Sequence, residues 1–455
     1  MAKPSHVPRL DDLLPRFARD PVMSLRLLRA PADLPPAFRA YRHWEQVRYH
    51  KPLPAGLSAE AWWCALKLLR ASTAQELPLR DVAGNPLRLS WPAGMADRLR
   101  ALGAKLAPGR LPGVAAKSTP EGAAQRAARW IDESASSSII EGARTSREAA
   151  HQILASARPP RDLAERMVAN NYDAVRFACA TAREPLTPSR LLDIQRRITD
   201  GTLRDGAQVG RFRTADDKVV LRRGDEVVFT PPPAAELPAR LARLCAFANG
   251  DEPAAAAMDP VLRAILVHFW LAYDHPFVDG NGRTARALFY ASMVRAGLGS
   301  VEHLSLSGAI LGNRRSYYEA FRFVQTDGGD VTYFVLNQLD LLEAAAEEPG
   351  GSPAVGEGWR PTRPVVQLPS LPGLNARQLA VLLASLADPG RAHTLAGHRR
   401  AHEVTAMTAW RDLSALRRKG WLVEAPTQGR ARSLVAAPDL ARRLRGRRRG
   451  LPAPR

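Results

Sequence analysis

The sequence predicts a mainly α-helical protein that ends in a smaller domain of helices and strands. Long segments such as 163–181 and 261–273 carry apolar residues at helical spacing or are apolar almost throughout. Runs of β type are few and short, and glycine or proline bounds them. Residues 349–374 are rich in glycine and proline, which indicates a linker between the helical part and the C-terminal domain.

Charge limits the kinds of partner that the chain can have. Lys and Arg number 65 against 45 Asp and Glu, a formal net charge of +20 over 455 residues. From residue 371 onward there are 17 basic and 5 acidic residues, so +12 of this charge lies near the C-terminus. A basic terminal domain indicates a polyanion partner such as DNA, although arginine-rich composition can also be a general habit of a genome.

Cysteine use and hydropathy indicate the compartment. Cys64, Cys179 and Cys245 lie in apolar helical patterns without the spacing of a metal site, so we expect buried thiols in a reducing compartment. No apolar run reaches the length of a membrane span, and the first residues lack the apolar core of a signal peptide. We therefore expect a cytoplasmic protein without membrane contact.

Residues 1–118 form an N-terminal region with few chemical signals. Trp44, Trp62 and Trp63 lie in segments compatible with helices, and such aromatic residues belong to a core more often than to a ligand site. Residues 79–91, interrupted by Gly-Asn-Pro, predict a short hairpin. We assign this region no chemistry.

The next 80 residues predict helices. A run of serines at 134–138 forms helices poorly, and we expect it to act as an N-cap near a break at Gly142. Glu141, between them, is by itself a solvated surface acid. Thr187 followed by Pro188 marks the start of a later helix.

Two short β-type runs, 218–221 and 227–230, predict a hairpin closed by three prolines. A short hairpin that ends in a polyproline step reads as an edge strand at the surface. By itself this segment predicts only a surface hairpin.

The segment 275–286 carries the clearest chemistry. His275 follows an apolar helix and precedes Pro276, which pushes it out of helical geometry. An imidazole with an ordinary pKa of about 6.5 is suited to accept a proton from a hydroxyl at neutral pH. Asp279 supplies a hard oxygen ligand of the kind that Mg²⁺ uses beside nucleotide phosphates.

The second half of this segment predicts an anion site. Gly280, Asn281 and Gly282 permit a tight turn whose N–H groups point inward. A helix that starts near Gly282 would add the positive end of its dipole. Arg283 and Arg286 are three residues apart, hence on one helical face, and both can bind phosphate oxygens.

The C-terminal domain, residues 375–440, predicts three helices and a strand–turn–strand. The helices are expected at 376–386, 396–402 and 406–419, and the strands at 421–424 and 432–435. This pattern resembles a winged helix-turn-helix.

In that geometry the third helix enters the DNA major groove. We expect Trp410, Leu413 and Leu416 to point inward. The candidate DNA contacts are Thr408, Arg411, Arg417, Arg418 and, on the wing, Arg430. A protein-binding or dimerising winged helix is the alternative. The basic tail, 441–455, would add non-specific, salt-sensitive affinity for DNA.

At every defined position, residues 275–286 resemble the signature of the Fic family, His-x-Phe-x-Asp/Glu-Gly-Asn-Gly-Arg-x-x-Arg. The resemblance implies a helical Fic core over 119–348 and transfer of AMP from ATP to a Ser, Thr or Tyr hydroxyl of a target protein. It implies that His275 is the base, that Asp279 holds Mg²⁺, and that Phe277 anchors the loop. Gly282 argues against the kinase orientation of the related Doc proteins, which carry lysine there.

The resemblance also gives Glu141 a role. Ser137-x-x-x-Glu141-Gly142 resembles the inhibitory motif that precedes the Fic core in one class of the family. A carboxylate that reaches Arg286 would occupy the cation that the γ-phosphate of ATP needs, so we expect autoinhibition. Whether it acts within one chain or across a homodimer stays open.

The predicted hairpin would be the Fic flap, which holds a target segment by main-chain pairing. Its residues are Lys218, Val219, Val220, Leu221, Val227 and Val228. Main-chain pairing does not identify the target. Two alternatives to AMP transfer remain: removal of AMP from a modified protein by the same site, and a DNA-binding regulator whose Fic core senses nucleotide.

Overall fold

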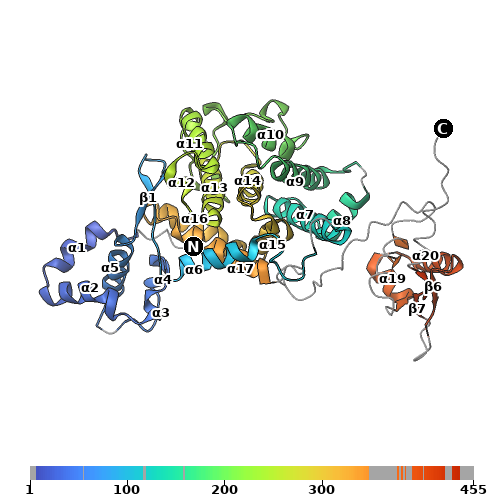
Figure 1. Cartoon of the computed structure of the whole chain (residues 1–455), viewed down its shortest axis with the longest axis horizontal. Coiled ribbons are helices and arrows are strands. Elements are labelled where there is room, and N and C mark those ends of the chain that lie inside the picture. The colour runs from blue at the N-terminus through green and yellow to red at the C-terminus, as the bar shows by residue number, and fades with distance from the viewer. Residues whose placement is uncertain are drawn as a thin grey trace. The chain divides into compact units, whose positions relative to one another are not determined.

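The computed structural model describes residues 7–54, 56–115, 119–156 and 159–347, and of the C-terminal part residues 377–378, 381–382, 385, 392–402, 404–425 and 433–440. The chain divides into two compact units, Met1–Pro361 and Thr362–Arg455 (Figure 1). The predicted linker 349–374 and the basic tail 441–455 lie outside the described residues.

The chain starts with a small group of helices that has its own core. These are α1 (Leu10–Ala18), α2 (Pro21–Asp33), α3 (Pro36–Arg39), α4 (Trp44–Val47) and α5 (Ala59–Ala71). The three tryptophans predicted to be core residues are buried here. The indole N–H groups of Trp62 and Trp63 donate to the carbonyls of Phe38 and Pro8, so the aromatic cluster also ties down the loops around α5.

The predicted hairpin at 79–91 is present as β1 (Gln75–Arg80) and β2 (Pro86–Leu89), paired antiparallel, and α6 (Met95–Leu106) follows it. The apolar side chains of these three elements belong to the same hydrophobic cluster as the helices after residue 119. The boundary expected between residues 118 and 119 therefore does not separate two hydrophobic cores.

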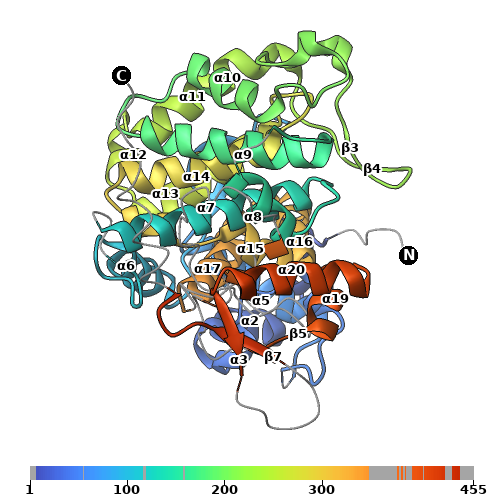
Figure 2. The same cartoon turned by 90° about the vertical axis from the view of Figure 1, so that its right-hand side faces the viewer.

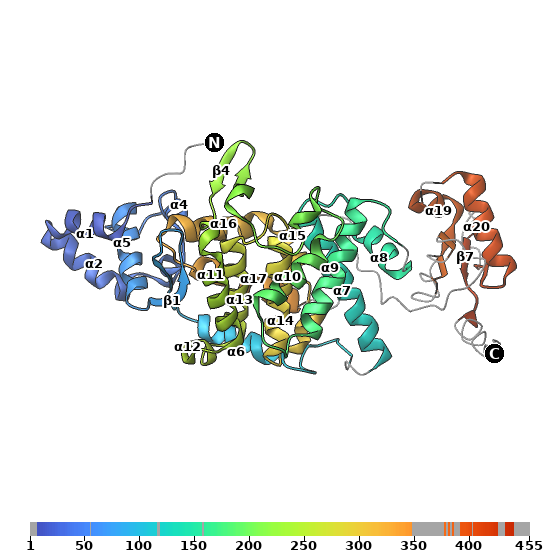
Figure 3. The same ribbon diagram turned by 90° about the horizontal axis from the view of Figure 1, so that it is seen from above.

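The helical core follows, as the sequence predicts. It comprises α7 (Pro120–Ile140), α8 (Arg147–Ser156), α9 (Leu163–Ala180), α10 (Pro188–Thr199), α11 (Leu237–Asn249), α12 (Pro253–Ala256), α13 (Pro260–Asp274), α14 (Asn281–Arg295), α15 (Leu306–Gly312), α16 (Arg314–Thr326) and α17 (Thr332–Glu347), with short 3₁₀ turns η1 (Gly206–Gln208), η2 (Ala215–Asp217), η3 (Ala234–Glu236) and η4 (Gly299–His303). Nearly every residue of α13 is buried, because α14, α11, α6 and α17 surround it (Figures 2 and 3).

Local sequence sets the helix ends. Thr187 caps α10 and Asp259 caps α13, each by accepting hydrogen bonds from N–H groups of the first turn. Proline at the first helical position follows each cap. In the part of the chain that the structure describes, no helix is both long and apolar enough to cross a bilayer.

The serine run does not act as an N-cap, so that expectation was wrong. Residues 134–138 lie inside α7, where all five side chains, four serines and one alanine, are buried. Their small size lets α7 pack closely against α9 and α15, which outweighs the weak helix propensity of serine. The helix ends where the sequence predicts a break: Glu141 is the C-cap, and Gly142 has a φ of 96°.

The predicted hairpin is present but begins later than expected. The strands are β3 (Leu221–Arg223) and β4 (Glu226–Phe229), joined by a turn at Gly224-Asp225. Lys218, Val219 and Val220 precede β3, so their assignment to the strand was wrong. Lys218 instead ends η2 with a φ of 49°. The hairpin projects from the helical core (Figures 2 and 3).

The second unit contains β5 (His393–Thr394), α19 (Leu395–His402), α20 (Ala406–Arg418), β6 (Leu422–Glu424) and β7 (Ser433–Ala436). The strands form an antiparallel sheet in the order β5-β7-β6. The described residues within 376–386 are helical. These elements match the predicted order of helices and strands, and the winged-helix assignment itself stays a prediction.

One buried position in α20 was predicted wrongly. Trp410 is 58% exposed, whereas Ala409, Leu413 and Leu416 are buried. Residues 409, 413 and 416 lie at i, i+4 and i+7 and form the buried face of the helix. Trp410 lies outside this face. Arg411, Arg417 and Arg418 are exposed, as expected, and Thr408 is half-buried. Arg430 lies outside the described residues.

A buried ion pair lies beneath the turn that follows α13. The Arg240 guanidinium donates to the Asp274 carboxylate at 2.8 Å, and both side chains are almost fully buried. The indole of Trp270 donates to the other carboxylate oxygen at 3.0 Å. Arg240 also donates to the carbonyls of Arg80 and Asp81, so this pair joins the β1–β2 hairpin to the central helix.

We predict that Asp274→Ala destabilises the protein by about 3–5 kcal/mol, because it leaves the Arg240 charge buried without its partner. The matched control is Glu236→Ala, which removes the half-exposed carboxylate that Arg240 contacts at 3.3 Å and should cost less than about 1 kcal/mol. Urea unfolding followed by circular dichroism measures both values. Equal losses would contradict the buried-pair interpretation.

Candidate active site

The turn between α13 and α14 carries the predicted site. His275 ends α13 in the left-handed region, with a φ of 48° and a ψ of 57°, so its side chain leaves the helix line. Gly280, with a φ of 85°, is the N-cap of α14. A Cβ on Gly280 would lie 3.1 Å from Ile198 and Thr199 of α10, so both its φ and its close approach favour glycine.

The loop is held closed by its own side chains. The Asn281 amide accepts a hydrogen bond from the Phe277 N–H at 2.9 Å and donates to the Phe277 carbonyl at 2.8 Å. The Phe277 ring is fully buried and stacks on Phe212 with the centroids 5.5 Å apart. These two hydrogen bonds fix the orientation of the Asn281 side chain, and its backbone N–H lies at the start of α14.

Two residues without an assigned role in the sequence analysis fix the loop from outside. The Arg213 guanidinium donates to the carbonyls of His275 at 2.8 Å and Pro232 at 2.5 Å. The backbone N–H of Arg213 donates to the Pro276 carbonyl at 2.8 Å. Gln195 of α10 donates to the Asp279 carbonyl at 3.2 Å. Both act on backbone atoms, and no sequence pattern reveals such contacts.

The His275 imidazole is oriented for proton transfer. Its Nδ1–H donates to the Ala272 carbonyl at 3.2 Å, which leaves Nε2 as the nitrogen that can accept a proton. Burial lowers the pKa of His275 below its ordinary value, and the nearby Glu141 carboxylate opposes this shift. The imidazole is therefore neutral at pH 7, as a general base must be.

The start of α14 offers donors for an anion. Within the described residues, no capping side chain accepts from the first N–H groups of this helix, which belong to Asn281, Gly282 and Arg283. Arg283 is 1% exposed and donates to Asp279 at 3.0 Å. Its Nε and Nη1 are buried without any hydrogen-bond partner. Unpaired buried donors at a helix N-terminus fit a phosphate group.

Asp279 lies at the mouth of the loop with its side chain 45% exposed. Its Oδ1 accepts from the Gly280 N–H at 2.6 Å and its Oδ2 from Arg283. Across the described residues no group of three His, Cys, Asp or Glu side chains lies close enough to hold a metal. A single exposed carboxylate fits Mg²⁺ that is bound mainly by nucleotide phosphates and water.

Glu141 lies against the same helix start. Its carboxylate accepts from Arg286 Nη2 at 2.8 Å, and Arg286 also donates to the hydroxyl of Ser137 at 2.9 Å and to its carbonyl at 3.1 Å. A Cβ built on Gly282 would collide with Glu141 Oε1, so the carboxylate lies directly over the glycine turn. Burial acts to lower the pKa of Arg286, but the Glu141 carboxylate opposes it, and the net effect is a raised pKa. All these contacts form within one chain.

Glu133, two helical turns before Glu141, is a further buried acid that the sequence analysis did not single out. It accepts hydrogen bonds from the Tyr290 hydroxyl at 2.9 Å and the Ser307 N–H at 2.8 Å, and also from the Ser305 and Ser307 hydroxyls. Burial raises its pKa. Glu133, Ser137 and Glu141 thus form one face of α7 toward α14.

The structure brings together most of the predicted site. The α13–α14 turn contains His275, Phe277, Asp279 and Gly280, and the start of α14 contains Asn281, Gly282, Arg283 and Arg286. Ser137 and Glu141 contact Arg286 from the end of α7, and Gly142 follows Glu141. The predicted DNA contacts belong to the other compact unit.

A neutral imidazole and unpaired anion donors on a helical scaffold are typical of a phosphate-transfer site. Residues 185–293 match the family described as Fic/DOC. The chain therefore carries a domain of the Fic/DOC family.

Curated relatives match over part of the chain. It is 35% identical to a protein adenylyltransferase fic-1 of Caenorhabditis briggsae over 24% of this chain and 19% of that protein. It is 30% identical to a protein adenylyltransferase Fic of Nematostella vectensis over 33% of this chain and 31% of that protein. The chain thus spans less than a third of the length of either relative.

Solved structures of similar fold include a Fic family protein from Desulfovibrio desulfuricans G20, with a TM-score of 0.48, 19% identity, and coverage of 76% of this chain and 97% of that chain. Fic-1 from C. elegans has a TM-score of 0.47 at 19% identity, with 76% of this chain and 88% of that chain covered.

We predict that Arg213→Met loosens the loop between α13 and α14. Loss of the three hydrogen bonds that its guanidinium donates, to the carbonyls of Asp274, His275 and Pro232, should lower the free energy of unfolding by about 2–4 kcal/mol and speed amide exchange over residues 275–282 at least tenfold. The matched control is Arg211→Met, which removes a partly exposed pair with Asp217 and should cost less than about 1 kcal/mol. Exchange measured by mass spectrometry compares the two. An unchanged exchange rate in Arg213→Met would show that contacts within the loop stabilise it without Arg213.

Proposed function

We propose that this protein is an adenylyltransferase that moves AMP from ATP to a Ser, Thr or Tyr hydroxyl of a target protein. One observation carries the proposal: a neutral imidazole with a free Nε2 lies in the same short turn as unpaired anion donors. The names of the curated relatives support the same chemistry.

In the proposed reaction His275 Nε2 accepts the proton of the target hydroxyl. The hydroxyl oxygen forms a bond to the α-phosphorus, and the bond from that phosphorus to the bridging oxygen of the β-phosphate breaks. Pyrophosphate leaves, and the products are AMP-modified protein and a protonated imidazole. The lowered pKa of His275 favours release of that proton to water after each turnover.

The donors at the start of α14 stabilise the charge that develops on the phosphates. Arg283 has two guanidinium nitrogens without partners, and the N–H groups of Asn281 and Gly282 lie beside it at the N-terminus of the helix. Such preorganised donors stabilise a developing negative charge without reorganisation. Mg²⁺ on Asp279, when bound, would neutralise phosphate charge and orient the leaving group.

We further propose that Glu141 inhibits the transfer. Its carboxylate occupies Arg286 and lies over Gly282, where a phosphate would need the same donors. Two anions cannot share these positions, because like charges repel and only one can accept each hydrogen bond. Productive binding of ATP then requires Glu141 to move away.

The protein with Glu141→Gly should transfer label from α-³²P ATP at least tenfold faster than the unaltered chain, with self-modification as the first readout. The matched control, Glu148→Gly, makes the same change at an exposed position in the first turn of α8 and should leave the rate unchanged. Adding His275→Ala to Glu141→Gly should abolish transfer.

Three outcomes would contradict this. An unchanged rate in Glu141→Gly would remove the autoinhibition, and transfer of γ-³²P label would indicate kinase chemistry. Release of AMP from pre-modified protein by the unaltered chain, without transfer by the variant, would favour the removal reaction instead.

The pH dependence of Glu141→Gly tests the base. Because the pKa of His275 is lowered, the imidazole stays neutral at pH 7 and becomes protonated only in more acidic solution. The rate should therefore be full at neutral pH and reach half its maximum below about pH 6.5. Removal of Glu141 takes away an influence that raises the pKa of His275, which moves the midpoint further down. Initial rates across about pH 5–8 measure it. A midpoint above about pH 6.5 would argue against His275 as the base.

DNA binding by the second unit is a separate question. Arg411, Arg417 and Arg418 are exposed on α20, which supports a phosphate backbone as partner. Met407 and Trp410 are also 58% exposed on this helix, and exposed apolar side chains favour protein contact. DNA binding therefore stays a prediction.

A further inference from the structure

The end of α7 carries four backbone carbonyls, those of residues 137–140, that have no partner within the helix itself. The middle two accept from the backbone N–H groups of Ala143 at 2.9 Å and Gly142 at 3.1 Å. The first accepts from the side chain of Arg286 at 3.1 Å. The last accepts from the side chain of Arg314, the first residue of α16, at 2.9 Å. Two arginines from other helices thus contact the end of α7 that carries the inhibitory acid.

The two arginines have different relations to the proposed reaction. Arg286 pairs with Glu141 and is the cation that a phosphate would need. Arg314 is exposed, and within the described residues its guanidinium makes no hydrogen bond or ion pair with the α13–α14 turn. A nucleotide that competes with Glu141 for Arg286 would therefore not compete for the contact between Arg314 and α7.

The hydrogen bond from Arg314 acts next to Glu141. The Ile140 carbonyl and the Glu141 N–H belong to one planar peptide unit, so a donor that fixes the carbonyl also fixes the position from which the Glu141 side chain departs. The Ile140 side chain is buried in the core, whereas the Glu141 side chain is 28% exposed. A cation is also favourable at this end of a helix, where the backbone dipole is negative. The contact therefore stabilises the residue at which α7 leaves the core.

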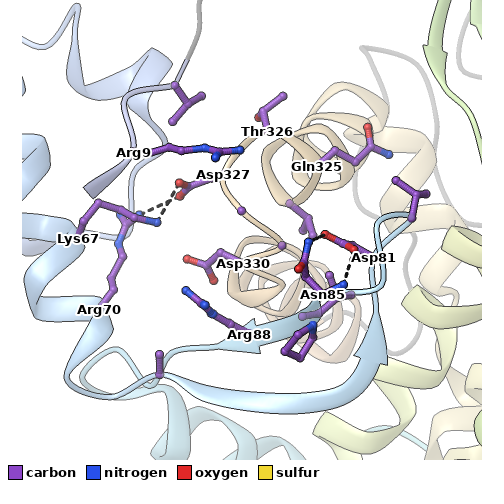
Figure 4. A pocket seen from close by; sticks show the side chains of 18 of the residues that line it. Arg9, Lys67, Arg70, Asp81, Asn85, Arg88, Gln325, Thr326, Asp327 and Asp330 are labelled. Carbon is purple, nitrogen blue, oxygen red and sulfur yellow. Dashed lines mark hydrogen bonds and ion pairs between the residues drawn. The ribbon is translucent and has the colours of Figure 1, made fainter. Parts of the chain in front are cut away.

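Helix α16 is itself anchored at both ends. Tyr317, one turn after Arg314, is buried and stacks on His268 of α13 with the ring centroids 6.0 Å apart. Asp327 is the C-cap of the helix, and its carboxylate accepts from Lys67 at 2.9 Å in the wall of the cavity that Figure 4 shows. Arg314 therefore joins the end of α7 to a helix that is fixed by other contacts.

We propose that Arg314 is a positioning residue for autoinhibition. By fixing the peptide between Ile140 and Glu141, it favours the conformation in which the Glu141 carboxylate pairs with Arg286. This inference rests on the proposed adenylyl transfer and on its inhibition by Glu141. It adds a control point outside the anion site, because loss of the Arg314 contact would release the carboxylate without any change to the groups that bind phosphate.

The test compares transfer of label from α-³²P ATP by the full chain with and without Arg314→Met, each in the unaltered background and in Glu141→Gly. Loss of one exposed charged contact at a helix C-terminus should raise the rate of the unaltered chain about threefold, because Glu141 then leaves Arg286 more often. The same change should leave the rate of Glu141→Gly as it is, since no carboxylate remains to be positioned.

Two further variants serve as controls. Arg314→Lys keeps a cationic donor and should restore most of the inhibition. Arg315→Met removes the neighbouring exposed arginine, which pairs with Glu319 of the same helix at 2.9 Å, and should change the rate in neither background. Equal rates of the unaltered chain and Arg314→Met, beside a faster Glu141→Gly, would overturn the proposal. The same fold-change in both backgrounds would also overturn it, because it would indicate a general effect on the fold.

Amide exchange over residues 138–143, measured by mass spectrometry, gives a second readout that does not need catalysis. Arg314→Met should speed exchange there about threefold, whereas Arg315→Met should not. Unchanged exchange in Arg314→Met would refute the positioning role. Absence of transfer by Glu141→Gly would refute the proposed reaction instead, and the exchange rates alone would then decide whether Arg314 fixes the end of α7.

Discussion

The active-site architecture depends on one electrostatic constraint: the Arg286 guanidinium is 2% exposed and needs an anion beside it. A buried charge without a partner destabilises a protein by about 3–5 kcal/mol. In this chain Glu141 is that partner. The geometry follows from the way α7 packs on α14, which sets Glu133 against Tyr290 and Ser137 against Arg286. The next helical turn of α7 then places Glu141 over Gly282.

This packing also indicates how the carboxylate could leave. Glu133 accepts four hydrogen bonds at the buried middle of α7, so movement of the whole helix would break a satisfied network. Glu141, by contrast, is the C-cap, and Gly142 follows it in a conformation that favours glycine. Fraying of the last turn needs fewer broken contacts. An anion that replaces the carboxylate would leave Arg286 paired.

Sequence reasoning predicts the parts of this structure that depend on neighbours along the chain. Caps such as Thr187 and Asp259, the α13–α14 turn and the spacing from Ser137 to Glu141 are local features of that kind. It misses Arg213 and Glu133, because their partners lie far away in sequence. A single arginine or glutamate does not by itself predict a buried contact. It places the serine run wrongly because burial against α9 and α15 overrides propensity. The same limit applies to Trp410, whose neighbours at 409 and 413 define the buried face.

On the proposed function, the hairpin accounts for contact with a target protein but not for the choice of target. Pairing to the backbone of β4 would place a target hydroxyl near His275 whatever the target sequence, because main-chain hydrogen bonds do not read side chains. Such pairing alone would modify any flexible segment. Selectivity then has to come from side-chain contacts near the hairpin, where Val227 and Val228 of β4 are exposed. A site that holds its target weakly can release the modified product and bind the next.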